Sequence, residues 1–457
     1  MRHAQAGLIP TALFTLISGT AGQAQGLPPL PDGLGGGGSA PPPLPIEIVD
    51  EPVAAADPLG GITFTGFAEV RAGTRTNDTA LHGDETLQEA RLHVDAEAGV
   101  AVTARLSFDL VADALADGET QDLQTGTGPF DLREASIGFS PAPFAEVKIG
   151  RQILTWGTGD MLFINDFFPK DYRSFILGRD QSYLKAPSDA AKVSLFSEVA
   201  NLDIVYTPQF DADRFPDGSR LSYYDPMAGA LSADPINVDR PDAAFEDDEI
   251  ALRLYRTYGS YELALYRYDG FWKSPAGFDT GTGLYTFPRV SATGASVRGP
   301  LGPGIFNIEA GYHDSLDDPS GSDPNLPNSE VRWLAGYQFE IAPELTLGAQ
   351  VYQEWLQDYA AYTAALAPGQ PARDERRDIV SLRLSGMFLN QTVQASLFSL
   401  YSPTDEDGLI RAGVSYKLDD RWTLSGGANH FFGTSDATPY GQFRENSNVH
   451  VAARVGF

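Results

Sequence analysis

Apolar and polar residues alternate with a period of two along most of the chain after residue 60. Ala90, Leu92 and Val94, for example, are separated by Arg91 and His93. The same alternation recurs in residues 102–110, 331–341, 380–388, 410–418 and 449–457. Successive side chains of a strand point to opposite faces, so each segment has one apolar and one polar face. No amphipathic helix of ordinary length separates these segments, which excludes an alternation of helices and strands.

Short and long connections alternate between the expected strands. Short turns such as 99–100 and 258–260 are separated by long stretches such as 113–130 and 207–248. Short turns at one end and long loops at the other are typical of bacterial outer-membrane barrels. A sheet that spans lipid must also close, because lipid offers its edges no hydrogen-bond partner. The pattern therefore predicts an all-β fold, a transmembrane antiparallel β-barrel of about 18 strands (within about 16–20), over residues 61–457.

The first 60 residues have a different composition. Residues 1–24 begin with Arg2 and His3, continue with a short apolar stretch and end in small residues, which is typical of a cleaved signal peptide. Residues 25–60 are rich in Pro and Gly, which predicts a disordered periplasmic linker. A tether, or a segment that enters the barrel, is the alternative for this linker.

Composition excludes several classes of protein. The chain has 61 acidic and 32 basic residues among 457, and this excess argues against nucleic acid as a partner. It has no cysteine, which excludes disulfides and thiolate metal sites. No run of about 18 apolar residues is present, which excludes a helical membrane span. Barrel strands escape that test, because each needs only about 10 residues of alternating polarity.

The last strand carries the most specific signal. Val451, Ala453, Val455 and Phe457 alternate with other residues up to the final position. A last strand that ends in an aromatic residue resembles the signal that the barrel-assembly machinery reads in outer-membrane proteins. Phe457 is therefore the expected assembly signal, and a soluble edge strand is the alternative. This signal predicts the cell outer membrane of a Gram-negative bacterium, with its lipid and lipopolysaccharide as partners.

Residues 155–189 depart from the alternating pattern. Their many apolar side chains, among them Phe163, Ile164, Phe167 and Phe168, would form a large exposed patch if the loop stood in solvent. Folding of the loop into the barrel would bury this patch and narrow the pore. A loop packed over the rim, or against a partner subunit, is the alternative. The expected constriction residues are Arg151, Asp160, Asp166, Lys170, Asp171, Arg173, Arg179, Asp180 and Lys185.

Arg151 is a special case among these residues, because it shares a strand face with the apolar Val147 and Ile149. A charge on the lipid side near mid-membrane costs about 2–4 kcal/mol. Arg151 is therefore expected near the membrane interface, or turned inward by a bulge at Gly150.

The polar faces of a closed barrel line its interior, and a barrel of about 16–18 strands is wide enough for an aqueous channel. Most interior charges are expected to pair with one another. A minority would form charged rings that set selectivity. The candidates for this role are Arg91, Arg105, Arg253, Arg332, Arg383 and Arg411. Aromatic residues near 255–261 and 266–272 are expected to form belts at the two membrane interfaces.

The loop 208–249 is strongly acidic, with Asp211, Asp213 and Asp217 among its many carboxylates. Clustered carboxylates can bind Ca²⁺ or Mg²⁺, but the spacing matches no known calcium loop. A solvated acidic extracellular loop is favoured over a metal site. Such a mouth would enrich cations and repel anions, most strongly at low salt.

The run 150–172 contains "GRQ", "WG", "GD" and "FPKDY". It resembles a segment of porin-like families of Gram-negative bacteria, among them alginate-export-like barrels and related uncharacterised barrel families. The resemblance covers a small part of the chain and implies an outer-membrane pore. Alginate exporters line their pore with a basic patch, whereas this interior is mixed and the chain is acidic. Alginate itself is therefore in doubt.

The predicted function is a porin-like channel for passive diffusion of small hydrophilic solutes, with no catalytic residues and no cofactor. A non-conducting or partner-dependent conduit or sheath, for export or electron transfer, is the first alternative. An outer-membrane enzyme is less favoured, because the surroundings of His313 lack the motif of outer-membrane phospholipases. A receptor with a plug is excluded, since too few residues precede the first strand. A homotrimer and a monomer both remain open.

Overall fold

The computed structural model describes residues 61–99, 101–116, 120–368, 370 and 372–457. All of these residues belong to one compact unit, Pro41–Phe457. The expected signal peptide, 1–24, and the expected linker, 25–60, lie outside the described residues.

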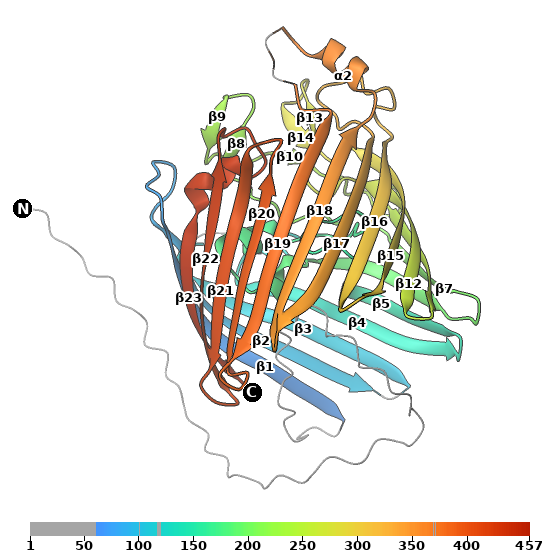
Figure 1. Ribbon diagram of the computed structural model, residues 1–457, viewed down its shortest axis with the longest axis vertical. Coiled ribbons are helices and arrows are strands. Elements are labelled where there is room, and N and C mark those ends of the chain that lie inside the picture. Colours follow the sequence, from blue (N-terminus) through green and yellow to red (C-terminus); the bar gives the residue numbers. More distant parts are fainter. Residues whose placement is uncertain (1–60, 100, 117–119, 369, 371) are drawn as a thin grey trace, which may run out of the picture. The chain divides into compact units, whose positions relative to one another are not determined.

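An 18-stranded sheet closes on itself (Figure 1). It closes because β1 (Ile62–Arg75) pairs with β2 (Glu85–Gly99) on one side and with β23 (Asn448–Gly456) on the other, antiparallel in both cases. The other strands of this sheet are β3 (Val102–Asp113), β4 (Phe130–Ala142), β5 (Ala145–Ile153), β6 (Pro187–Leu195), β7 (Asn201–Thr207), β11 (Glu249–Tyr258), β12 (Tyr261–Phe271), β15 (Arg289–Leu301), β16 (Gly304–Ser315), β17 (Glu330–Ala342), β18 (Leu345–Leu356), β19 (Arg376–Phe388), β20 (Val393–Ser402), β21 (Asp407–Lys417) and β22 (Trp422–Gly433). The predicted fold class is confirmed.

The long connections carry the remaining elements. These are the helices α1 (Tyr172–Leu177) and α2 (Tyr359–Ala365), the 3-10 turns η1 (Gln181–Leu184) and η2 (Gly441–Asn446), and the short strands β8 (Tyr223–Asp225), β9 (Ala230–Ser232), β10 (Val238–Asp239), β13 (Gly277–Asp279) and β14 (Leu284–Thr286). α2 lies beyond one end of the barrel strands, and the short strands lie near the same end (Figure 1). No described helix is long and apolar enough to cross a membrane.

The two faces of the wall differ as the period of two predicts. In β1, Val70 is 59% exposed, whereas its neighbours Glu69 and Arg71 are each 6% exposed. Leu92 in β2 is likewise exposed, and Arg91 beside it is buried. The apolar face therefore points outward, and the polar face points into the barrel, where its charges find partners.

One irregularity adds a charge to the interior. The pairing of β3 with β4 shifts register between Ser107 and Phe108, which leaves Arg133 as an extra residue in β4. A bulge of this kind puts two residues opposite one and turns the strand locally. As a result Arg133 and its neighbour Glu134 are both buried.

The expected aromatic belts are wrong for part of their residues. Tyr258 and Tyr261 are exposed, as a belt requires. Tyr266 and Tyr268 are 2% and 3% exposed and belong to a buried apolar cluster. They share the inward face of β12 with Ala264, which is also buried. The alternation of side chains along the strand therefore decides which way these tyrosines point, whatever their aromatic character.

Candidate functional site

The connection between β5 and β6, residues 154–186, packs against inward-facing side chains of the wall. We call it the inner loop. Near its start Trp156 and Phe168 meet edge-on, with ring centroids 4.9 Å apart, and Phe167 stacks on Tyr268 of β12 at 4.7 Å. Each such side chain, when fully buried, contributes about 1.5–3 kcal/mol. The apolar side chains of this segment are therefore buried inside the barrel, against inward-facing residues of the wall.

Two further apolar clusters continue the contact around the wall. Leu162 and Ile164 pack with Leu334 of β17 and with residues of β18, β19 and β20. Ile176 and Leu177 of α1 pack with Leu87 of β2 and with residues of β21 and β22. The inner loop thus reaches strands that are far apart in the sheet.

Glu309 of β16 is the main polar anchor of the first half of the inner loop. It is 1% exposed. Its carboxylate accepts hydrogen bonds from the backbone N–H of Thr158 at 2.5 Å and of Asn165 at 2.8 Å. It also accepts from the Thr158 hydroxyl at 2.9 Å and from the Asn165 amide at 3.0 Å. One carboxylate therefore fixes both ends of the turn 158–165.

Asp160 extends from this turn to β19. Arg383 donates hydrogen bonds to the Asp160 carboxylate from Nε and from Nη2, the latter at a distance of 2.8 Å. The backbone N–H of Asp160 donates to Gln350 of β18 at 3.0 Å. Arg383 also lies over the Phe398 ring at 4.7 Å. The predicted constriction residue Asp160 and the predicted interior residue Arg383 are thus brought together as an ion pair.

Helix α1 begins at a capped end. Asp171 accepts from the backbone N–H of Ser174 at 2.7 Å, which satisfies one of the first N–H groups of the helix. Arg214, from the loop after β7, lies 3.5 Å from the same carboxylate. Arg214 also donates to both oxygens of Asp131 in β4, at 2.7 and 2.9 Å. The cap is thereby tied to the wall.

The other end of α1 is held by donors from four strands. Its last carbonyls have no partner within the helix, so they need donors from elsewhere. Arg71 of β1 donates to the carbonyl of Gly178 at 2.7 Å. Arg411 of β21 donates to the carbonyls of Phe175 and Arg179 at 3.1 and 2.8 Å.

Two amides complete this set of donors. Asn429 of β22 and Asn448 of β23 both donate to the carbonyl of Ile176, at 3.1 and 2.8 Å. Positive charge near the carboxyl end of a helix is favourable, so the placement of Arg71 and Arg411 suits its electrostatics. Of these four residues only Arg411 is among the interior candidates expected from the sequence.

Gly178 lets the chain leave α1 along the wall. Its φ is +85°, a left-handed value that favours glycine. A Cβ atom at this position would lie 2.3 Å from Nδ1 of His450 in β23. Only glycine therefore satisfies both the backbone conformation and the close approach.

Arg179 and Asp180 follow with ion pairs to the wall. Arg179 donates to Glu89 of β2 at 2.6 Å, and Asp180 lies 3.6 Å from Arg454 of β23. Burial opposes ionisation of Asp180, but the charge of Arg454 and the hydrogen bonds of Ser182 outweigh it and hold its pKa below the usual range.

Tyr183, near the end of the inner loop, lies between two guanidinium groups of the wall. Arg91 and Arg133 lie 4.5 and 4.6 Å from its ring centroid, and its hydroxyl donates to Asp109 of β3 at 3.1 Å. Burial raises the pKa of the Tyr183 hydroxyl, so it stays a donor at neutral pH. The Lys185 carbonyl accepts from Arg133 at 2.8 Å.

Three other expected constriction residues make contacts within the loops. Lys170 is buried and lies 3.0 Å from Asp166. Arg173 donates to the carbonyl of Thr125 and lies 3.7 Å from Asp217. Lys170 and Asp166 therefore pair within the inner loop, and Arg173 joins the inner loop to two other loops.

Arg151 lies apart from the inner loop's polar contacts. The pairing of β5 with β4 and β6 runs through Gly150 without a register shift, so no bulge turns Arg151 inward. Its guanidinium pairs with Asp189 of β6 at 2.6 and 2.8 Å and donates to the carbonyl of Leu123 at 2.7 Å. It sits near the end of β5, beneath the loop that precedes β4.

The remaining interior candidates fall into two groups. Arg332 pairs with Glu330 at 2.6 Å and lies over the Trp272 ring at 5.2 Å, within reach of the first apolar cluster. Arg105 and Arg253 pair with Glu134 and Glu262, at 3.4 and 2.6 Å. The ion-pair partners of Arg105 and Arg253 both lie on barrel strands and not on the inner loop.

The acidic loop 208–249 is only partly solvated. Asp234, Asp239 and Asp242 are exposed, as expected. Asp211 and Asp213 are buried, and Asp213 accepts from the backbone N–H of Lys170 at 2.7 Å. A fully solvated loop is therefore wrong for its first carboxylates: Asp213 binds the inner loop, and Asp211 accepts from the backbone N–H of Asp189 in β6 at 2.9 Å.

Burial also changes the acidity of these two groups. It raises the pKa of Asp211 to about 6, although the backbone N–H of Asp189 and the charge of Lys273 favour the carboxylate. Burial raises the pKa of Asp213 as well. Within the described part of the chain, no three His, Asp or Glu side chains are grouped so that they could hold a metal ion.

Sequence reasoning did not single out the anchors Glu309, Asn429 and Asn448, or the donor Arg71. Each occupies an inward position of a strand, as dozens of polar residues do. The available signal was the need of an apolar loop for polar anchors, and it does not say which wall residues supply them.

Comparison with known proteins agrees with this architecture. A family model described as Gram-negative porin matches residues 52–437. Among solved structures, two mutant forms of the Rhodopseudomonas blastica porin are 11% identical, with 87% of this chain and 100% of theirs covered and TM-scores of 0.38 and 0.39. A TM-score below 0.5 adds nothing to the family match. No curated protein matches the chain. Since the family model spans most of the sequence, the chain belongs to the Gram-negative porin family and is an outer-membrane channel for passive diffusion.

Proposed function

We propose that small hydrophilic solutes diffuse through the barrel along a path that the inner loop narrows. One observation carries this proposal. The inner loop contacts inward side chains of strands around the whole wall, from Tyr268 of β12 through Glu309, Arg383 and Arg411 to Glu89 of β2. A solute that crosses the barrel would have to pass beside this loop.

The charges of the inner loop suggest weak ionic selectivity at this level. Asp160, Arg179 and Asp180 are each paired with a wall residue of opposite sign. Paired charges largely cancel at a distance, so they form no ring of one sign. The exposed carboxylates of the loop 208–249 would instead favour cations at the mouth, and salt would screen this preference.

We also propose that Phe457 is the residue that the assembly machinery reads. The last residue is 46% exposed, and its backbone exchanges hydrogen bonds with Gly66 of β1 at 2.9 and 3.0 Å. Phe457→Ala would then lower the yield of folded barrel in cells while leaving refolding from urea into detergent unchanged. Equal loss in both would contradict this role.

The remaining parts of the proposal concern the setting of the channel. The short turns and the N-terminal segment lie on the periplasmic side, and lipid and lipopolysaccharide surround the outward apolar face. The channel acts without catalysis and without a resident cofactor, and the acidic loop is assigned no Ca²⁺ or Mg²⁺. A homotrimer and a monomer are both compatible with the exposed apolar strands.

Single-channel recording in planar bilayers tests the proposal. The refolded full chain should give stable, voltage-independent steps with a modest cation preference that falls as salt rises. EDTA should leave the steps unchanged. A barrel that is verified as folded and shows no conductance would contradict the proposal and favour a sheath or a partner-dependent conduit.

A further inference from the structure

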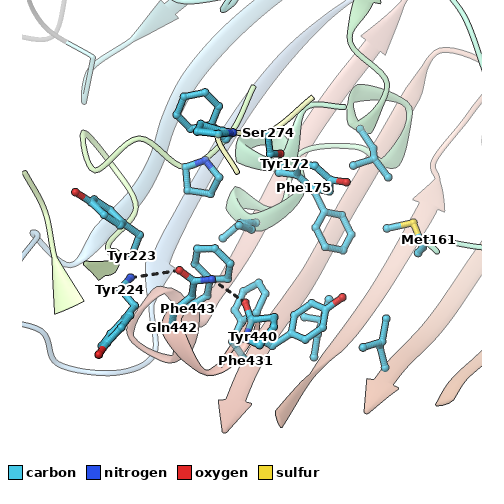
Figure 2. A pocket seen from close by; sticks show the side chains of 18 of the residues that line it. Met161, Tyr172, Phe175, Tyr223, Tyr224, Ser274, Phe431, Tyr440, Gln442 and Phe443 are labelled. Atoms are coloured by element: carbon cyan, nitrogen blue, oxygen red, sulfur yellow. Dashed lines mark hydrogen bonds between the residues drawn. The ribbon is translucent and has the colours of Figure 1, made fainter. Parts of the chain in front are cut away.

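A cavity of about 500 Å³ lies between the inner loop, the wall at β20–β22 and the loops that follow β7 and β12. Tyr172 and Phe175 of α1 line it from the inner loop, and Phe431 of β22, Tyr440 at the start of η2 and Phe443 of η2 line it from the wall side (Figure 2). Its volume is within the range of about 300–1,000 Å³ that is usual for small-molecule sites.

The lining of this cavity differs from the rest of the interior. Every described residue that lines it is Phe, Tyr, Met, Leu, Ile, Pro, Ser or Gln, so none carries a charged side chain. Elsewhere the interior holds many ion pairs, such as Arg383 with Asp160. An apolar lining is unfavourable for ions and sugars, because they would lose hydration without gaining a partner.

The apolar side chains of the cavity are not packed away. Phe175, Tyr440 and Phe443 remain partly exposed, although they belong to or pack against the apolar clusters of the inner loop. Apolar surface that stays accessible inside a concave site commonly marks a place where an apolar ligand binds.

The polar groups of the cavity are few and uncharged. Gln442 is already engaged, since it accepts from the backbone N–H of Tyr224 at 3.3 Å and donates to the carbonyl of Pro439 at 3.1 Å (Figure 2). The phenol groups of the five described tyrosines that line it are the other polar groups on its aromatic side chains: Tyr172, Tyr223, Tyr224, Tyr285 and Tyr440. They suit a ligand with one or two hydroxyl groups.

We propose that this cavity binds an uncharged ring compound, aromatic or alicyclic, that carries at most one or two hydroxyl groups. Aromatic rings on two sides of the cavity suit a flat ring, because offset-stacked and edge-on contacts between rings are favourable. Binding does not depend on conduction. Only the consequence that the channel admits such compounds beside hydrophilic solutes rests on the proposed function.

Equilibrium dialysis with the refolded full chain in amphipol tests the proposal, with 2-naphthol as the probe and empty amphipol as the blank. The expected result is saturable binding at one site per chain. The carboxylate 2-naphthoate, which has the same ring system and a negative charge, should bind at least about tenfold more weakly.

Two substitutions and a matched control locate the site. Phe443→Ala and Tyr224→Ala each remove a partly exposed ring from the lining, and each should weaken 2-naphthol binding about tenfold. Phe432→Ala removes a ring beside Phe431 that contacts Tyr401 instead of the cavity, and binding should stay within about twofold. If Phe443→Ala fails to fold, Tyr224→Ala decides.

The outcomes separate this proposal from the channel function. Absence of saturable binding, or equal binding by all three variants, in a preparation that conducts ions would overturn the cavity assignment alone. Saturable binding that the two lining variants weaken, in a preparation without conductance, would support the cavity and count against the pore.

Discussion

Residues 154–169 and residues 170–186 lie against the same interior wall, but different interactions hold them there. The first half is bound by apolar clusters around Phe168 and Ile164, by the buried carboxylate of Glu309 and by the ion pair of Asp160 with Arg383. The second half also buries Ile176 and Leu177, but it is bound mainly by charged and amide donors, with Arg411 and Arg71 directed at backbone carbonyls. The first half therefore depends more on burial of apolar surface, and the second half depends more on directed hydrogen bonds.

This difference has a consequence for function. Apolar contacts have no preferred direction, so the first half can shift slightly without losing much stability. Hydrogen bonds to charged groups weaken steeply with geometry, so the second half is fixed in one position. The second half also lines the apolar cavity through α1, and a fixed wall favours binding there.

The largest expected effect is that of Glu309→Ala, which breaks the main polar anchor of the first half. Two backbone N–H groups, of Thr158 and Asn165, would lose their buried acceptor, at about 1–3 kcal/mol each. Hydrogen exchange in residues 158–165 should accelerate by about a hundredfold or more. Glu340→Ala, at an exposed site, is the control. Unchanged exchange in the Glu309 variant would show that the apolar clusters suffice.

Gly178→Ala tests the fixed position of the second half. The left-handed backbone costs about 1–2 kcal/mol with a Cβ, and the contact with His450 adds about 1–3 kcal/mol. Hydrogen exchange in residues 172–180 should therefore accelerate. Gly229→Ala is matched for φ, at +65°, but meets nothing within 4 Å, so it isolates the backbone cost. Equal effects of the two substitutions would refute the close approach.

Arg411→Met tests whether an arginine that donates to the inner loop stabilises it more than an arginine that only pairs with charges of the wall. Arg411 donates to two carbonyls of the inner loop, whereas Arg105 pairs only with carboxylates of the wall. Its loss should cost about 2 kcal/mol of local stability in residues 175–179. Arg105→Met should cost less than about 1 kcal/mol, because its side chain is 46% exposed. The same exchange experiment measures both, and a larger effect of Arg105→Met would count against the comparison.

The smallest expected effect is a dependence on pH. The pKa of Asp211 is about 6 in the folded protein against 3.8 ordinarily, so the folded state favours its protonated form. The resulting stability is fully present below pH 3.8 and is lost as pH rises through 6. The barrel should gain about 1 kcal/mol between pH 7 and pH 5 from this group. Thermal unfolding of Asp211→Asn should lack this gain, and an identical pH profile in both proteins would disprove it.

Much of the fold could be predicted from the sequence because a strand's side chains have only two sides. The position of Val70 between Glu69 and Arg71 fixes which face meets lipid. The apolar content of 155–189 likewise predicts that this loop needs cover. The assignment of Tyr266 to a membrane belt failed, since the interior of this barrel also needs aromatic partners for Trp156 and Phe168.

Other features depend on contacts that no local pattern shows. The bulge at Arg133 changes which residues face inward, although nothing in the residues around it marks the shift. Asp211 and Asp213 look like their solvated neighbours in the sequence, but both are buried, Asp211 against β6 and Asp213 against the inner loop. The aromatic cavity joins α1 with Tyr224, Phe431 and Tyr440, so only the closed barrel brings its lining together.

The inner loop should narrow the path through the barrel, and its removal should widen that path. Single-channel conductance of the full chain should be compared with that of a variant in which residues 158–180 are replaced by a short Gly-Ser linker. A matched deletion of α2, at the same end of the barrel, is the control. The conductance should be severalfold larger in the first variant and unchanged in the second. Equal conductance of the three folded proteins would contradict it.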